Sequence, residues 1–112
     1  MQQLNTVTNY QAGESLRQEF TIKEGDNPWP FVDQADISWM LLDSSGDDDP
    51  LLSDSDSGIS IEIIDETEGR FDIVIDKGLT NDYAGDTLWE RLVIEWQTEK
   101  QVYSGSFRVL KP

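Results

Sequence analysis

A loop over residues 44–58 holds the residues of this chain best suited to bind a metal ion. Its aspartates supply hard oxygen ligands of the kind that Ca²⁺ prefers. They are Asp47, Asp48, Asp49, Asp54 and Asp56. An EF-hand loop needs ligands at positions 1, 3 and 5 and a glycine at position 6, but with Gly58 in that place the three ligand positions hold serines. We therefore predict no metal site, with a looser Ca²⁺ site in this loop as the alternative.

Residue types that most enzymes need are missing from the sequence. The chain has no histidine and no cysteine, which removes the commonest general base, the commonest zinc ligand and any thiolate metal site. No Gly-x-Ser-x-Gly nucleophile motif and no phosphate-binding glycine loop occurs. Among 23 acidic residues, a pair of carboxylates at any spacing arises by chance and does not indicate a glycosidase. The sequence predicts a protein that is not an enzyme and has no catalytic residues and no cofactor.

Aromatic residues are the candidates for an interface. In Pro28-Trp29-Pro30-Phe31, two prolines stiffen the backbone around two aromatic side chains. Trp29 and Phe31 either anchor a partner, as Trp does in many interfaces, or fill one end of the folded domain. Trp89 has the opposite strand parity to Leu92 and Ile94, so it faces outward or lies on a bulge. The predicted interface residues are Trp29, Phe31 and Trp89.

The net charge of −15 is concentrated in one part of the chain. No Lys or Arg occurs between Lys23 and Arg70, and 14 acidic residues lie from Glu24 to Glu68. The remaining residues carry a net charge of only −1. Such an acidic protein repels nucleic acids and anionic membranes, and no apolar run approaches the roughly 20 residues of a membrane-spanning helix. We expect neither nucleic acid nor membrane as a partner.

The elements that position these residues are predicted to be strands. Apolar residues alternate over residues 59–63 and 71–75, on either side of a short linker that contains Gly69, which is the pattern of a β-hairpin. Four further segments show the same alternation: residues 16–22, 35–43, 87–97 and 101–110. Parity places Trp39 and Trp96 in the core. Six strands with one apolar face each predict an all-β, antiparallel sandwich of two sheets. Residues 1–12 are polar and aperiodic and predict a flexible N-terminal arm, followed by the sandwich over residues 13–112.

The order of these segments resembles the immunoglobulin-like domains of tailed-phage virion proteins, including those similar to the N-terminal domain of baseplate upper proteins. The resemblance covers about residues 15–110, and its segments are residues 20–26, 33–39, 58–61, 68–73, 79–80, 84–86 and 104–109. It implies an immunoglobulin-like β-sandwich with an extended N-terminal arm.

The resemblance also implies a non-enzymatic virion structural protein. A single domain with an N-terminal arm favours a capsid decoration or cement protein that binds the major capsid protein. The alternatives are a tail, neck or baseplate component bound to tail proteins, or a host-surface glycan-binding module in which Trp29 and Trp89 stack on sugars. Homo-oligomerisation is a further expectation, and the virion, assembled in the host cytoplasm, is the expected location. The charge distribution predicts that the nearly neutral half, with the arm, faces the particle and that the acidic loop faces solvent.

Overall fold

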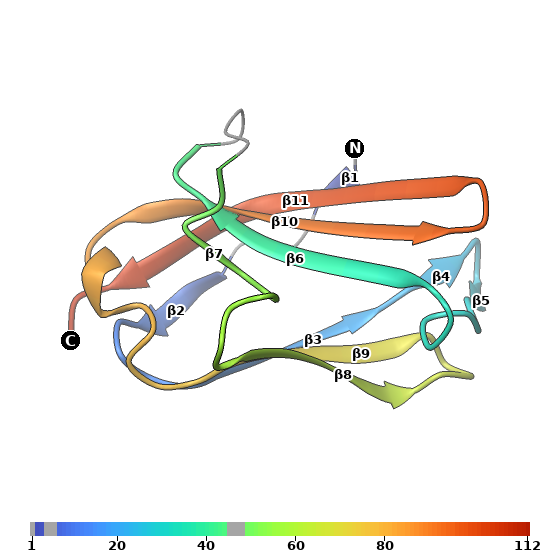
Figure 1. The fold of residues 1–112 in the computed structure, drawn as a ribbon, viewed down its shortest axis with the longest axis horizontal. Coiled ribbons are helices and arrows are strands. Elements are labelled where there is room, and N and C mark those ends of the chain that lie inside the picture. Colours follow the sequence, from blue (N-terminus) through green and yellow to red (C-terminus); the bar gives the residue numbers. More distant parts are fainter. Residues whose placement is uncertain (1, 4–6, 45–48) are drawn as a thin grey trace.

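The computed structural model describes residues 2–3, 7–44 and 49–112, and for residues 2–3 and 7–9 the backbone alone. Two layers of β-sheet form the domain (Figure 1). The smaller sheet has the order β3-β9-β8, and its strands are antiparallel. Its bounds are β3 Leu16–Thr21, β8 Ile59–Asp65 and β9 Arg70–Ile75.

The larger sheet has the order β1-β11-β10-β6-β7, and β2 also pairs with β11. Its bounds are β1 Gln2–Gln3, β2 Val7–Gln11, β6 Asp36–Leu42, β7 Leu52–Ser53, β10 Thr87–Trp96 and β11 Glu99–Leu110. A small hairpin of β4 Lys23–Glu24 and β5 Asn27–Pro28 closes one end, and a short 3₁₀ helix, η1 Asn81–Tyr83, precedes β10. All six strands predicted from alternation are present, which confirms the all-β sandwich. Among the described residues, no helix is long and apolar enough to cross a membrane.

The core forms where the apolar faces of the two sheets meet. The larger sheet contributes Trp39 and Leu92, and the smaller sheet contributes Phe71 and Ile73, all with no exposed surface. The rings of Phe20 and Phe71 stack at 5.4 Å between their centroids. Burial of alternate residues on each strand removes apolar surface from water and is the main stabilising term of such a sandwich. The predicted core positions Trp39 and Trp96 both pack in this cluster, Trp96 at its partly exposed margin.

The N-terminal segment differs from the predicted flexible arm. Residues 7–11 form β2, which pairs in parallel with β11, and Tyr10 is only 4% exposed. The Tyr10 ring packs edge-on against Phe107, and its hydroxyl group lies 2.9 Å from Thr80 Oγ1. Sequence periodicity misses this strand because its backbone pairs with β11 and its residues do not alternate between apolar and polar types. The sandwich therefore begins before residue 13.

Gly69 closes the turn between β8 and β9 in a space that no side chain fits. Its φ is +72°, and an added Cβ would lie 2.4 Å from the Ile22 carbonyl oxygen and 2.8 Å from the Trp29 carbonyl oxygen. The Gly69 carbonyl in turn accepts a hydrogen bond from the Ile22 backbone N–H at 2.9 Å. This close approach ties the β8–β9 turn to the hairpin of β4 and β5.

We expect Gly69→Ala to destabilise the domain by about 2–4 kcal/mol, because it combines a left-handed backbone with a clash against fixed carbonyl oxygens. Gly25→Ala is the matched control: φ is +63° there, but nothing lies within 4 Å of the added Cβ. That variant should lose only about 1 kcal/mol. Chemical denaturation of the two variants and the wild type measures both values. Equal losses would contradict the close packing at Gly69.

Candidate functional site

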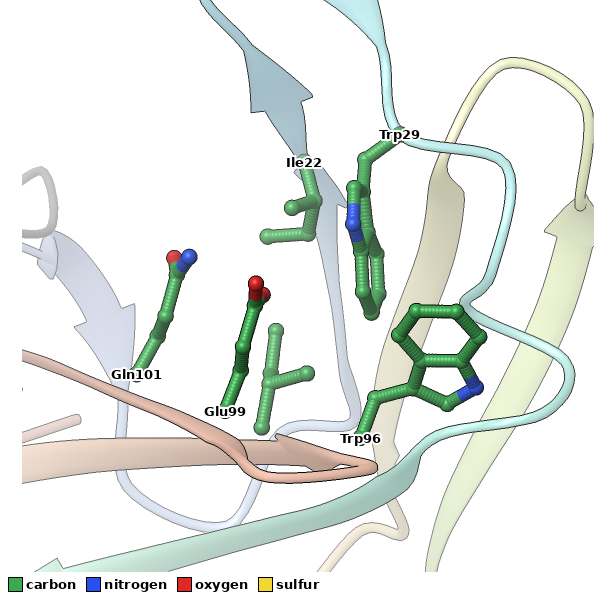
Figure 2. Close-up of a pocket in the computed structure, with 6 residues that line it drawn as sticks. Ile22, Trp29, Trp96, Glu99 and Gln101 are labelled. Atoms are coloured by element: carbon green, nitrogen blue, oxygen red, sulfur yellow. The ribbon is translucent and has the colours of Figure 1, made fainter.

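The predicted interface residues Trp29 and Phe31 lie together at one end of the sandwich. Trp29 is only 8% exposed. Its ring meets the rings of Phe31 and Trp96 edge-on, with centroids 5.5 Å and 5.9 Å away, and Phe31 stacks on Trp96 at 4.1 Å. Figure 2 shows the Trp29 ring beside Ile22 and the Trp96 ring at the other end of the Trp29 side chain. This geometry corresponds to the alternative in which the aromatics fill the end of the domain, and it leaves Trp29 little ring surface on which a sugar could stack.

A groove lies beside this aromatic cluster. Its volume is about 460 Å³, and it runs between the β4–β5 hairpin and the start of β11. Both sides are charged, with Lys23 and Glu24 on one and Glu99 and Lys100 on the other. An adjoining pocket that shares Ile22 and Trp29 with the groove measures only about 10 Å³, roughly the space for a single water molecule. The groove is therefore an open, polar surface feature without a deep apolar pocket.

Trp89, the third predicted interface residue, lies far from this cluster in the fold. The register of β10 with both neighbours is continuous through Trp89, which pairs with Leu42 on β6 and Ser106 on β11. There is thus no bulge, and the side chain points away from the smaller sheet, as one of the two alternatives predicted. Trp89 is half-buried, and its indole Nε1 is buried with no hydrogen-bond partner among the described residues. Buried indole N–H groups usually have a partner.

Apolar and basic side chains surround Trp89 on what we call the outer face, the side of β6, β10 and β11 that points away from the smaller sheet. By register, its central residues are Met40, Leu42, Trp89, Arg91, Val93 and Val102. Its charged residues are Asp36, Glu95, Arg91, Lys100 and Arg108. Three basic and two acidic side chains give this face a net charge of +1, on a chain whose net charge is −15. The outer face is therefore much less acidic than the chain as a whole.

The acidic loop is only partly within the described residues. Asp47 and Asp48 lie outside them, and Asp49 is exposed. Asp54 Oδ1 accepts a hydrogen bond from the Trp39 backbone N–H at 2.9 Å, and Asp56 Oδ2 accepts one from the Ser53 backbone N–H at 2.8 Å. No group of three or more acidic side chains in the described part of the loop is arranged to hold a metal ion. Asp54 and Asp56 instead stabilise the turn that follows β7.

Glu90 is a buried carboxylate that sequence reasoning missed. It has no exposed surface. Its Oε2 accepts a hydrogen bond from Trp39 Nε1 at 2.6 Å, and its Oε1 accepts one from Gln18 Nε2 at 3.1 Å. Burial raises the pKa of Glu90, and the two hydrogen bonds lower it in part. The signal that could have found it is its place in the alternation: Glu90 lies on the same face of its strand as Leu88 and Leu92, which are both buried.

A buried acid with a raised pKa is a candidate catalytic group, but the surroundings of Glu90 give it a structural role. Both oxygens are bonded to protein side chains, and Glu90 lines neither of the two pockets described above. The carboxyl group links the larger sheet to Gln18 on β3 of the smaller sheet. Gln18 Oε1 is buried without a partner among the described residues, so rotation of its amide would let this oxygen accept a hydrogen bond from the O–H of a neutral Glu90.

Comparison with solved structures supports the fold. A crystal structure of the titin M3 domain is similar to this chain, with a TM-score of 0.54, 16% sequence identity, and coverage of 94% of this chain and 88% of that chain. At this identity the likeness shows the fold alone, an immunoglobulin-like β-sandwich. No family model matches the chain. No curated protein matches it either.

We expect Glu90→Gln to stabilise the domain at neutral pH, because the amide keeps the bond from Trp39 and removes the need to bury a charge. The folded pKa of Glu90 lies above its ordinary value of 4.5. Between this ordinary pKa and the raised pKa of the folded state, the folded protein holds a proton that the unfolded protein releases. The free energy of unfolding therefore falls as the pH rises through this range.

The advantage of the Gln variant should therefore be absent below the ordinary pKa, grow as the pH rises above it and become constant above the folded pKa. Urea denaturation of both proteins across this pH range measures the difference. A constant difference at every pH would show that Glu90 titrates in the folded protein as an exposed acid does.

Proposed function

We propose that this chain is a non-enzymatic structural protein of a tailed-phage virion, which decorates or cements the capsid by docking onto the major capsid protein. The resemblance of its strand order and turn motifs to phage immunoglobulin-like domains supports the phage setting. The satisfied hydrogen bonds of Glu90 inside the core support a role without catalysis. An immunoglobulin-like fold is compatible with many functions, so the docking role depends on the surface.

The observation that carries the docking role is the outer face around Trp89. A half-buried Trp whose buried N–H has no partner in the described part of the chain, beside Arg91 and apolar side chains, has the composition of an interface centre, where Trp and Arg are enriched. A partner acceptor would satisfy the indole N–H, and the partner's surface would cover Met40 and Val93. The closed aromatic end with Trp29 offers much less ring surface.

Charge supports the same orientation. A subunit of net charge −15 approaches another protein with least long-range repulsion through its least acidic face. The outer face comes mainly from β10 and β11, which belong to the nearly neutral half of the chain. The acidic loop over residues 44–58 begins just after Leu42, the β6 partner of Trp89, so it borders this face, and we expect its exposed acids to stay in solvent at the rim of the contact.

Localisation on the intact particle tests this proposal. Antibody raised against the purified chain and detected by immunogold labelling should mark phage heads, and head fractions separated from tails should contain the chain. Signal confined to tails would replace the capsid role with a tail, neck or baseplate role. Absence of the chain from purified particles would overturn the virion role altogether.

Trp89→Ala should weaken binding to particles that lack the chain by about 30-fold or more, because a Trp at an interface centre contributes roughly 2 kcal/mol or more. Sedimentation of labelled protein with such particles measures the affinity. Lysine substitution of Asp47, Asp48 and Asp49 is the control and should leave binding intact. Melting curves must first show that each variant is folded. Binding that survives Trp89→Ala in the folded protein, or is lost on reversal of the loop charge, would contradict docking through the outer face.

A further inference from the structure

The strand β8 has a free edge on the smaller sheet. It pairs with β9 on one side and with no described strand on the other. The Asp76 N–H donates to the Gly58 carbonyl at 2.8 Å, and Ile59 lies opposite Ile75. Hydrogen-bonded pairs alternate along an antiparallel ladder, so residues 60 and 62 bond toward β9. Ile61 and Ile63 therefore direct their backbone N–H and C=O groups toward the free edge.

Apolar side chains accompany these backbone groups. Ile63 and Ile64 are 40% and 43% exposed, and they are the exposed large hydrophobic residues of the described part of the chain. The register of β8 with β9 shifts between Ile63 and Asp65, and this bulge explains why two consecutive isoleucines both reach solvent. An edge with unpaired backbone and exposed apolar side chains can accept a further strand.

The charge around β8 defines the chemistry of the strand that fits. The whole of β8 lies in the segment from Glu24 to Glu68, which has no Lys or Arg. The Glu62 side chain is 46% exposed on the outward side of the strand, although Arg17 bonds one of its oxygens at 2.7 Å. Further carboxylates lie at the ends of β8: Asp56, Asp65, Glu66 and Glu68. Pairing of two copies through β8 would bring these acids together, whereas a basic segment would neutralise them.

We propose that the free edge of β8 binds an extended segment of a partner protein as an added antiparallel strand, with apolar side chains beside Ile61 and Ile63 and basic side chains beside Glu62. Residues directly opposite each other in an antiparallel pair share a face. The apolar residues of the partner are thus the ones whose N–H groups bond to β8. This inference adds a second partner-binding surface to the proposed structural role. It rests on that role in one respect, namely that the chain binds other proteins.

A fluorescent octapeptide of alternating valine and lysine, titrated into the full chain, tests the proposal. Saturable binding is expected, with slower hydrogen exchange at the Ile61 and Ile63 amides. Methylation of the valine backbone nitrogens should weaken binding by more than about tenfold, because it removes the bonds to β8. Methylation of the lysine backbone nitrogens leaves those bonds and the charge unchanged and should alter affinity by less than about twofold.

Two protein variants complete the experiment. Ile63→Lys places a charge on the apolar side of the edge and should abolish binding, whereas Asn27→Lys adds the same charge at an exposed site on β5 and should leave binding within about twofold. Equal affinities for the two methylated peptides, equal effects of the two variants, or no binding up to about 1 mM would overturn the proposal. None of these results would alter the outcome at the outer face, so the two proposals fail separately.

Discussion

The hydrogen bonds of Glu90 are the interaction on which the packing of the two sheets depends. One carboxyl group on the central strand β10 receives Trp39 Nε1 from β6 and Gln18 Nε2 from β3. It lies at a position of the core face where an apolar side chain would ordinarily be placed, so it fixes how the sheets lie against each other. Trp39 fills the centre of the core with no exposed surface, and an unpaired indole N–H there would cost stability. The acid thus accepts the hydrogen bond of the largest fully buried side chain in the core.

The outward faces of the two sheets carry different kinds of side chains. On the smaller sheet, Arg17 bonds both Glu62 and Asp72, and Arg70 bonds Glu19. These ion pairs cross all three strands, and they leave that face polar and internally paired. The outer face of the larger sheet also carries an ion pair, between Lys100 and Glu95 at 3.7 Å, but its centre around Trp89 holds the apolar side chains Met40 and Val93. Under the proposed docking role, the partner would contact mainly this apolar centre around Trp89.

Alternation in the sequence was sufficient to predict the six long strands, because each buries one face in a common core. It was insufficient for Glu90, since an acid at an inward position has no signature apart from parity. The strand β2 was not predicted because it pairs with β11 through its backbone, and its sequence shows no alternation. The position of Trp29 stayed open because two prolines specify a stiff backbone but not its direction. For Ile63, strict alternation predicted a core position, but the bulge before Asp65 exposes its side chain together with Ile64.

The excess negative charge makes each partner surface selective. Repulsion from a chain of net charge −15 disfavours most contacts, so binding requires either a locally weak field or a basic partner. The outer face meets the first condition with its net charge of +1, and the β8 edge meets the second because its surroundings are acidic. The two surfaces belong to opposite layers of the sandwich (Figure 1). Under the two proposals, one subunit would hold a partner on each surface without competition, which is the arrangement that a protein linking neighbours in an assembly requires.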